Sequence, residues 1–195
     1  MGLGAWRKRV REYNEITNLG PTTRRYFVIG AFDGALTILG IVVGAFSSGA
    51  GEAERGIVLA ASLSAAIALA VSSAVGAYEA ERVENKLDIY SLERAMLTRL
   101  SEEHRDAFRF AAYTSSAVHG VAPFVAAIPP IVPFFFLPIE EAIVTSIAIT
   151  AVFLFAIGAY LGSIARERLV VTGLRFVAAG LGTAAVLWLF RVGLH

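Results

Sequence analysis

Cysteine is absent from the chain, and this absence excludes disulfide bridges, thiolate metal sites and thiol nucleophiles. The net charge is also close to zero, because the chain has 17 Lys and Arg residues and 16 Asp and Glu residues. This balance favours no class of charged partner. The sequence also lacks a Ser-His-Asp set, a phosphate-binding glycine loop and a metalloprotease motif. We therefore expect neither an enzyme nor a protein that binds nucleic acid.

Long apolar segments are what the sequence has in abundance. Hydrophobic residues make up 56% of the chain and its mean hydropathy is +0.66, whereas soluble domains contain about 45–50% apolar residues. The excess lies in five segments long enough to cross a hydrocarbon core of ~30 Å as helices. They are residues 26–47, 56–78, 107–128, 141–163 and 169–191. The sequence predicts an all-α integral membrane protein that forms a single membrane domain over residues 1–195.

The first 25 residues precede these spans and carry several basic side chains. Trp6, Val10, Tyr13 and Thr17 recur there at helical spacing. This pattern is typical of an amphipathic helix that lies on an anionic membrane surface, and a plain basic tail is the alternative. The first span is too long for a signal-peptide core, so we expect it to be retained.

The second span continues without Gly or Pro to about Leu100. We expect one long helix whose acidic extension, within residues 79–106, projects from the membrane by on the order of 30 Å. The third span is expected to stop within residues 128–133, IPPIVP, because proline removes backbone donors.

Basic residues outside the spans predict the orientation of the chain, since cytoplasmic loops collect Lys and Arg. With the N-terminus inside, only Arg55 and Arg191 of the 17 basic residues lie outside, which leaves 15 inside. The N-terminus is predicted to be cytoplasmic and the C-terminus external, in the plasma membrane of a prokaryote.

Small residues occur four positions apart in several spans, a spacing that lets helix backbones approach closely. A generic membrane composition is the alternative explanation. Because five such helices form a thin bundle, we expect a homo-oligomer. The pairs are Gly30/Gly34, Gly40/Gly44, Ser72/Gly76 and Gly158/Gly162.

Asp33 is the only carboxylate in the interior of a predicted span. A charged residue there costs roughly 2.5–3.5 kcal/mol on insertion, so it should face a cavity, an ion or a partner. One such group can bind either a cation or a proton; a protonated Asp that hydrogen-bonds a neighbouring helix is the alternative. Thr37, one turn later, either adds an oxygen ligand or bonds back to its own helix.

Acidic residues form a second candidate site on the extension. Glu81, Glu84 and Asp88 share one helix face, and Glu79 and Glu93 flank them. Carboxylates bind hard divalent cations and Fe²⁺. A solvated helix with pairs such as Glu79–Arg82 is the alternative.

Two further groups are candidate functional residues, and each also has a purely structural interpretation. Glu102, Glu103 and His104 either supply more metal ligands or form a polar turn between helices. His119, within the third span, is either a proton relay or metal ligand, or an interhelical hydrogen-bond partner.

Three short motifs resemble the vacuolar iron transporter family. Residues 27–37, FVIGAFDGALT, are similar to its first-span signature. Residues 72–78, SSAVGAY, followed by acidic residues, are similar to the end of its second span, and residues 120–123, GVAP, to its third-span Gly-x-x-Pro. The resemblance covers all five spans in order.

The resemblance implies a homodimer that exports Fe²⁺ or Mn²⁺ from the cytosol in exchange for protons. It places Asp33 on the ion path and makes Glu79, Glu81, Glu84 and Glu93 candidate collectors of the transported metal, with no tightly bound cofactor. Ser73 stands where plant members have a pathway methionine, and the metal-binding segment is shorter than theirs. Transport of Mg²⁺ or Ca²⁺, or a non-transporting metal-responsive scaffold, is the alternative function.

Overall fold

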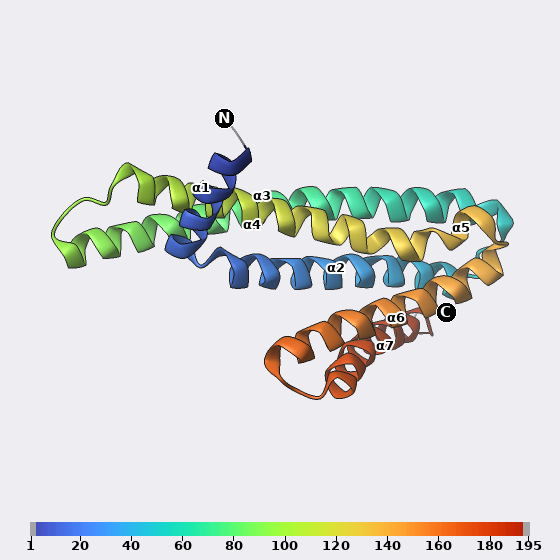
Figure 1. The fold of residues 1–195 in the computed structure, drawn as a ribbon. Helices are drawn as coiled ribbons and strands as arrows, with labels where there is room; N and C mark the ends of the chain where they lie inside the picture. Colours follow the sequence, from blue (N-terminus) through green and yellow to red (C-terminus); the bar gives the residue numbers. More distant parts are fainter. Residues whose placement is uncertain (1–2, 193–195) are drawn as a thin grey trace. The chain divides into compact units, whose positions relative to one another are not determined.

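The computed structural model describes the backbone of residues 3–192 and the side chains of residues 8–189. Within these residues the chain is helical, with no strand (Figure 1). Five helices, α2, α3, α4, α6 and α7, are long and apolar enough to cross a membrane, which confirms the predicted class. The elements are α1 Leu3–Thr17, α2 Leu19–Ser48, the 3₁₀ turn η1 Glu52–Glu54, α3 Arg55–Met96, α4 Glu102–Ile131, α5 Pro133–Phe136, α6 Ile139–Ala165 and α7 Leu169–Val192.

Helix α3 confirms that the second span and its extension form one continuous helix of 42 residues. The predicted end near Leu100 is wrong by four residues, because the helix stops at Met96. Leu97 adopts a left-handed conformation with φ of 53°, which ends the helix, and the chain then turns back into α4. The turn is held by the Glu93 carboxylate, which accepts the Leu100 N–H at 3.0 Å.

Helix α4 ends at Ile131, within residues 128–133 where the third span was expected to stop, but it passes Pro129 and Pro130 before it ends. The Val132 N–H donates to the Ile128 carbonyl at 3.1 Å, so the helical path persists beyond the prolines. Pro130 is fully buried, and packing of this kind lets membrane helices tolerate proline. Val132 still has helical geometry, with φ of −51° and ψ of −43°, and the α-helical ladder ends before Pro133 because proline has no N–H to donate.

The chain forms two compact units, and helices α2, α3 and α4 each contribute to both. The first unit contains Met1–Ile29 and Ala70–Val121; the second contains Gly30–Leu69 and Ala122–His195. The expected single membrane domain stays a prediction.

The second unit has a core of aliphatic residues around Ile38, Val42 and Phe134. Gly34 permits its tightest contact, because a Cβ there would lie 2.2 Å from the Pro123 carbonyl oxygen. Gly158 similarly lies against the Thr172 carbonyl of α7, 2.6 Å from where its Cβ would be. The predicted role of small residues in close packing is confirmed at these two positions.

In the first unit, α1 confirms the predicted N-terminal helix. The Tyr13 ring packs on Phe110 of α4 with centroids 5.5 Å apart. The side chain of Trp6 lies outside the described residues, and placement of α1 on a membrane surface stays a prediction. Gly120 of α4 approaches α3 closely, since a Cβ there would lie 2.6 Å from the Ala74 Cβ.

Candidate functional site

Three carboxylates of the extension line one cavity of about 190 Å³ in the first unit. Glu81, Glu84 and Asp88 therefore share a face of α3, as their spacing predicted. We call this space the acidic cavity. Its other lining residues come from α1, α2, α3 and α4, and are Thr17, Leu19, Thr22, Arg25, Asn85, Phe108, Ala111 and Ser115.

The acidic cavity offers oxygen atoms and negative charge to a cation. The three carboxylates and the Arg25 guanidinium give the cavity lining a net charge of −2 when all four groups are ionised. The Ser115 hydroxyl is fully buried and has no hydrogen-bond partner among the described residues.

The acidic cavity is not a complete metal coordination sphere by itself. No three His, Cys, Asp or Glu side chains in the described part of the chain lie close enough to hold one metal ion. The cavity can attract a hydrated divalent cation through its charge. Tight binding would need ligands from water or another chain.

Two predicted collectors, Glu79 and Glu93, lie elsewhere on the extension. The Glu79 carboxylate pairs with Arg82 at 2.6 Å, as the alternative interpretation proposed. Glu93 pairs with Arg105 of α4 at 2.6 Å and accepts the Leu100 N–H. The Leu100 hydrogen bond, followed by the Arg105 interaction, lowers the pKa of Glu93, which lies beyond the apolar part of α3. Neither residue lines the acidic cavity, and their roles as metal ligands stay predictions.

The patch formed by Glu102, Glu103 and His104 lies at the start of α4. The two glutamates occupy its first turn, where negative charge complements the helix dipole. The Ser101 hydroxyl lies 2.8 Å from Nδ1 of His104. These contacts fit a polar turn between helices, and metal binding by the patch stays a prediction.

The predicted pathway residues divide between the two units. In the second unit, Asp33 is half-buried on α2 and the Thr37 hydroxyl donates to the Asp33 carbonyl at 2.7 Å. This is the back-bonded arrangement, in which the Thr37 oxygen still carries acceptor lone pairs. In the first unit, Ser73 is half-buried on α3.

His119 connects α4 to α2 in the first unit. Its Nδ1 lies 3.0 Å from the Tyr26 carbonyl, and the two rings are tilted with centroids 4.9 Å apart. Because a carbonyl only accepts, Nδ1 carries the proton in this contact. His119 is thus an interhelical hydrogen-bond partner, and its role as a proton relay stays a prediction.

Comparison with known proteins identifies the family. Residues 24–109 and 88–191 match the model of the VIT family. The chain belongs to the VIT family. It is also 30% identical over 177 residues to an uncharacterized protein of Methanocaldococcus jannaschii, an alignment that covers 88% of this chain and 90% of the relative. The resemblance noted in the sequence is confirmed, and the protein is a membrane metal-ion transporter by family.

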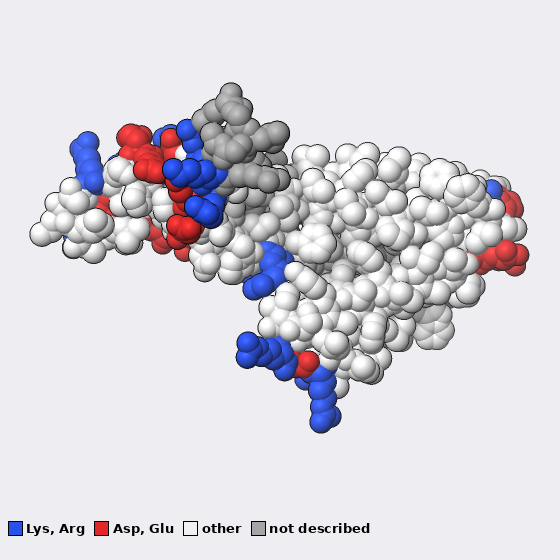
Figure 2. All heavy atoms as spheres, in the orientation of Figure 1, with Lys and Arg blue, Asp and Glu red and all other residues white. Residues whose placement is uncertain are grey.

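In this VIT-family protein, sequence reasoning missed the uncharged and basic residues of the acidic cavity. Asn85 follows Glu84 directly, and helical spacing would have placed it beside the acidic face. Arg25 and Ser115 lie on other helices, so only the tertiary structure brings them to the carboxylates. Figure 2 shows charged side chains gathered around this part of the molecule and nearly absent from the apolar segments.

Proposed function

We propose that this VIT-family protein exports Fe²⁺ or Mn²⁺ from the cytosol in exchange for protons. The observation that carries the proposal is the acidic cavity, which Glu81, Glu84 and Asp88 line together. Its position on the extension beyond the apolar part of α3 suits the capture of a hydrated cation before the ion enters the membrane. The predicted cytoplasmic side of the extension would make the cytosol the source.

The second step of the proposed route uses Asp33. A carboxylate inside an apolar helix is costly unless it serves an ion or a partner. Gly34 beside it lets Pro123 of α4 pack closely against α2. In a homodimer with the two α2 helices at the axis, the paired Asp33 groups would titrate together. Such a pair exchanges a divalent cation for protons because either state neutralises the same two charges.

Flux measurements test this proposal. We expect Mn²⁺ and Fe²⁺ uptake into proteoliposomes to depend on a pH gradient in the wild type and to fall at least tenfold in Asp33→Asn. Asp106→Asn is the matched control, because Asp106 is half-exposed and outside the acidic cavity. Normal flux in Asp33→Asn would remove Asp33 from the path; absence of flux in the wild type would refute exchange of these ions.

The donor set also supports a second candidate function, transport of Mg²⁺ or Ca²⁺. The polar groups of the acidic cavity comprise carboxylates, hydroxyls, one amide and one guanidinium, and hard cations prefer such oxygen ligands. Competition among Fe²⁺, Mn²⁺, Mg²⁺ and Ca²⁺ in the same flux assay separates the two functions. Metal binding without transport of any of the four would instead favour a scaffold.

A further inference from the structure

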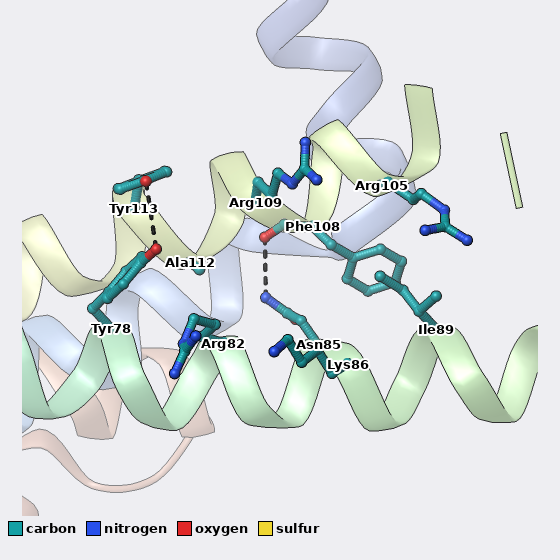
Figure 3. A pocket seen from close by; sticks show the side chains of 10 residues that line it. All are labelled: Tyr78, Arg82, Asn85, Lys86, Ile89, Arg105, Phe108, Arg109, Ala112 and Tyr113. Carbon is teal, nitrogen blue, oxygen red and sulfur yellow. Dashed lines mark hydrogen bonds between the residues drawn. The ribbon is translucent and has the colours of Figure 1, made fainter. Parts of the chain in front are cut away.

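A second cavity in the first unit adjoins the acidic cavity, shares Asn85 and Phe108 with it, and carries the opposite charge. It measures about 350 Å³ and opens between the extension and the start of α4 (Figure 3). Four of its ten lining residues are basic and none is acidic. We call it the basic cavity; it is lined by Tyr78, Arg82, Asn85, Lys86, Ile89, Arg105, Phe108, Arg109, Ala112 and Tyr113.

The two helices present these residues in matching order. Tyr78 of α3 stacks on Tyr113 of α4 with centroids 5.0 Å apart. Cations lie four and eight positions from each tyrosine: Arg82 and Lys86 follow Tyr78 on α3, and Arg109 and Arg105 precede Tyr113 on α4. At 1.5 Å per residue, these cations lie about 6 and 12 Å beyond the tyrosines along the helices.

The register between the helices is fixed by side-chain contacts. The Asn85 amide donates to the Phe108 carbonyl at 3.0 Å, and the two tyrosine hydroxyls lie 3.4 Å apart. Figure 3 shows both contacts and places the basic side chains between and beyond them. The cavity is therefore built by fixed elements on both sides.

The position of the tyrosine pair relates this cavity to the membrane surface. Tyr78 ends the apolar part of α3, and tyrosines concentrate at the boundary between lipid and water. The headgroup layer extends roughly 5–8 Å beyond the hydrocarbon core on each side. The first pair of cations, Arg82 and Arg109, thus falls at the depth of lipid phosphates.

Existing ion pairs leave these cations able to bind an anion. Arg82 pairs with Glu79, and Arg109 pairs with Asp106. In each pair the residues are three positions apart and half-exposed, and ion pairs of this kind contribute little to stability. A guanidinium has five donors and can keep its carboxylate while binding a phosphate. The acidic groups Glu81, Glu84 and Asp88 line the other cavity.

We propose that the basic cavity binds the headgroup phosphate of an anionic phospholipid, taken from the leaflet at which α3 leaves the membrane. Arg82, Lys86 and Arg109 bind the phosphate, while Arg105 stays paired with Glu93. Tyr78, Tyr113 and Ala112, which lie on the membrane side of these cations, contact the rest of the lipid. This combination of charge, apolar lining and depth fits a lipid better than a free anion. The proposal does not depend on which ion the protein transports.

Native mass spectrometry of the full-length protein in detergent tests the proposal, with phosphatidylglycerol and phosphatidylcholine as probes. We expect phosphatidylglycerol to bind preferentially, and Lys86→Gln with Arg109→Gln to weaken its binding by an order of magnitude or more, at roughly fivefold for each cation. The matched control is Arg94→Gln with Arg99→Gln, which removes two cations of the same extension that do not line the cavity. Lys86→Arg with Arg109→Lys keeps the charge and should retain binding.

Three results would overturn the lipid site. The first is an unchanged preference for phosphatidylglycerol in the Lys86→Gln/Arg109→Gln variant. The second is an equal loss of phosphatidylglycerol binding in the Arg94→Gln/Arg99→Gln control, which would indicate diffuse electrostatic attraction. The third is displacement of phosphatidylglycerol by millimolar inorganic phosphate, which indicates a free-anion site. Circular dichroism and size-exclusion chromatography check folding; if the double variant misfolds, the single variants are measured, each with an expected loss of about fivefold.

Discussion

The Ser115 hydroxyl sets the sharpest test of the acidic cavity at the scale of single residues. It is fully buried at the cavity wall without a protein partner in the described structure. If it contacts the shell of a captured cation, Ser115→Ala should weaken Mn²⁺ binding about fivefold, the effect of one hydrogen bond of ~1 kcal/mol. Folding should not suffer, because the substitution removes a buried polar group that no protein atom satisfies.

The control for this prediction is the next residue of α4. Ser116 is also buried, but its hydroxyl donates to the Ala112 carbonyl at 2.7 Å, so Ser116→Ala should leave Mn²⁺ affinity unchanged. Titration of Mn²⁺ followed by electron paramagnetic resonance measures both variants. Equal affinities in Ser115→Ala and wild type would show that the hydroxyl does not contact the bound ion.

At the scale of elements, the hairpin between α3 and α4 should depend on pH through Glu93. Its folded pKa lies below the ordinary value of 4.5, first because the carboxylate accepts the Leu100 N–H and then because of Arg105. A depressed carboxyl pKa stabilises the fold above the unfolded pKa, and this contribution is lost as pH falls through the folded value. The turn at residues 97–101 should therefore open in acid and stay closed at neutral pH.

Hydrogen exchange at the Leu100 amide, corrected for the intrinsic effect of pH, measures this opening. In Glu93→Gln the amide should already exchange faster at pH 7, with little further pH dependence. Glu102→Gln is the control, because Glu102 lies at the start of α4 and holds no hydrogen bond across the turn. Slow, pH-independent exchange in Glu93→Gln would contradict the assigned role of the carboxylate.

The same elements show how far sequence reasoning reaches. Apolar length predicted the five spans, and helical spacing predicted that Glu81, Glu84 and Asp88 share a face, because both depend on one helix at a time. The path of α4 through Pro129 and Pro130 was not predictable, since it depends on packing against other segments. For the same reason the spacing could not show that Glu93 pairs with Arg105 or that Ser115 joins the acidic cavity.

At the scale of the whole molecule, the exchange mechanism that we propose requires two copies with their α2 helices at a shared axis. The absence of cysteine makes this arrangement directly testable, because a single introduced cysteine is the only thiol in each chain. Ile29 is exposed and lies one turn before Asp33 on the same side of α2. We expect Ile29→Cys to form a disulfide-linked dimer in oxidised membranes.

Distance makes this cross-link selective for the axis. A disulfide needs Cα atoms within about 4.4–6.8 Å of each other, so only positions near a twofold axis can pair with their own copies. Val152→Cys on α6 is an exposed apolar control that should stay monomeric on a non-reducing gel. Equal cross-linking of both variants would indicate random collision in the membrane. A monomeric Ile29→Cys that also transports normally would separate Asp33 from the dimer axis and require each protomer to exchange its ion alone.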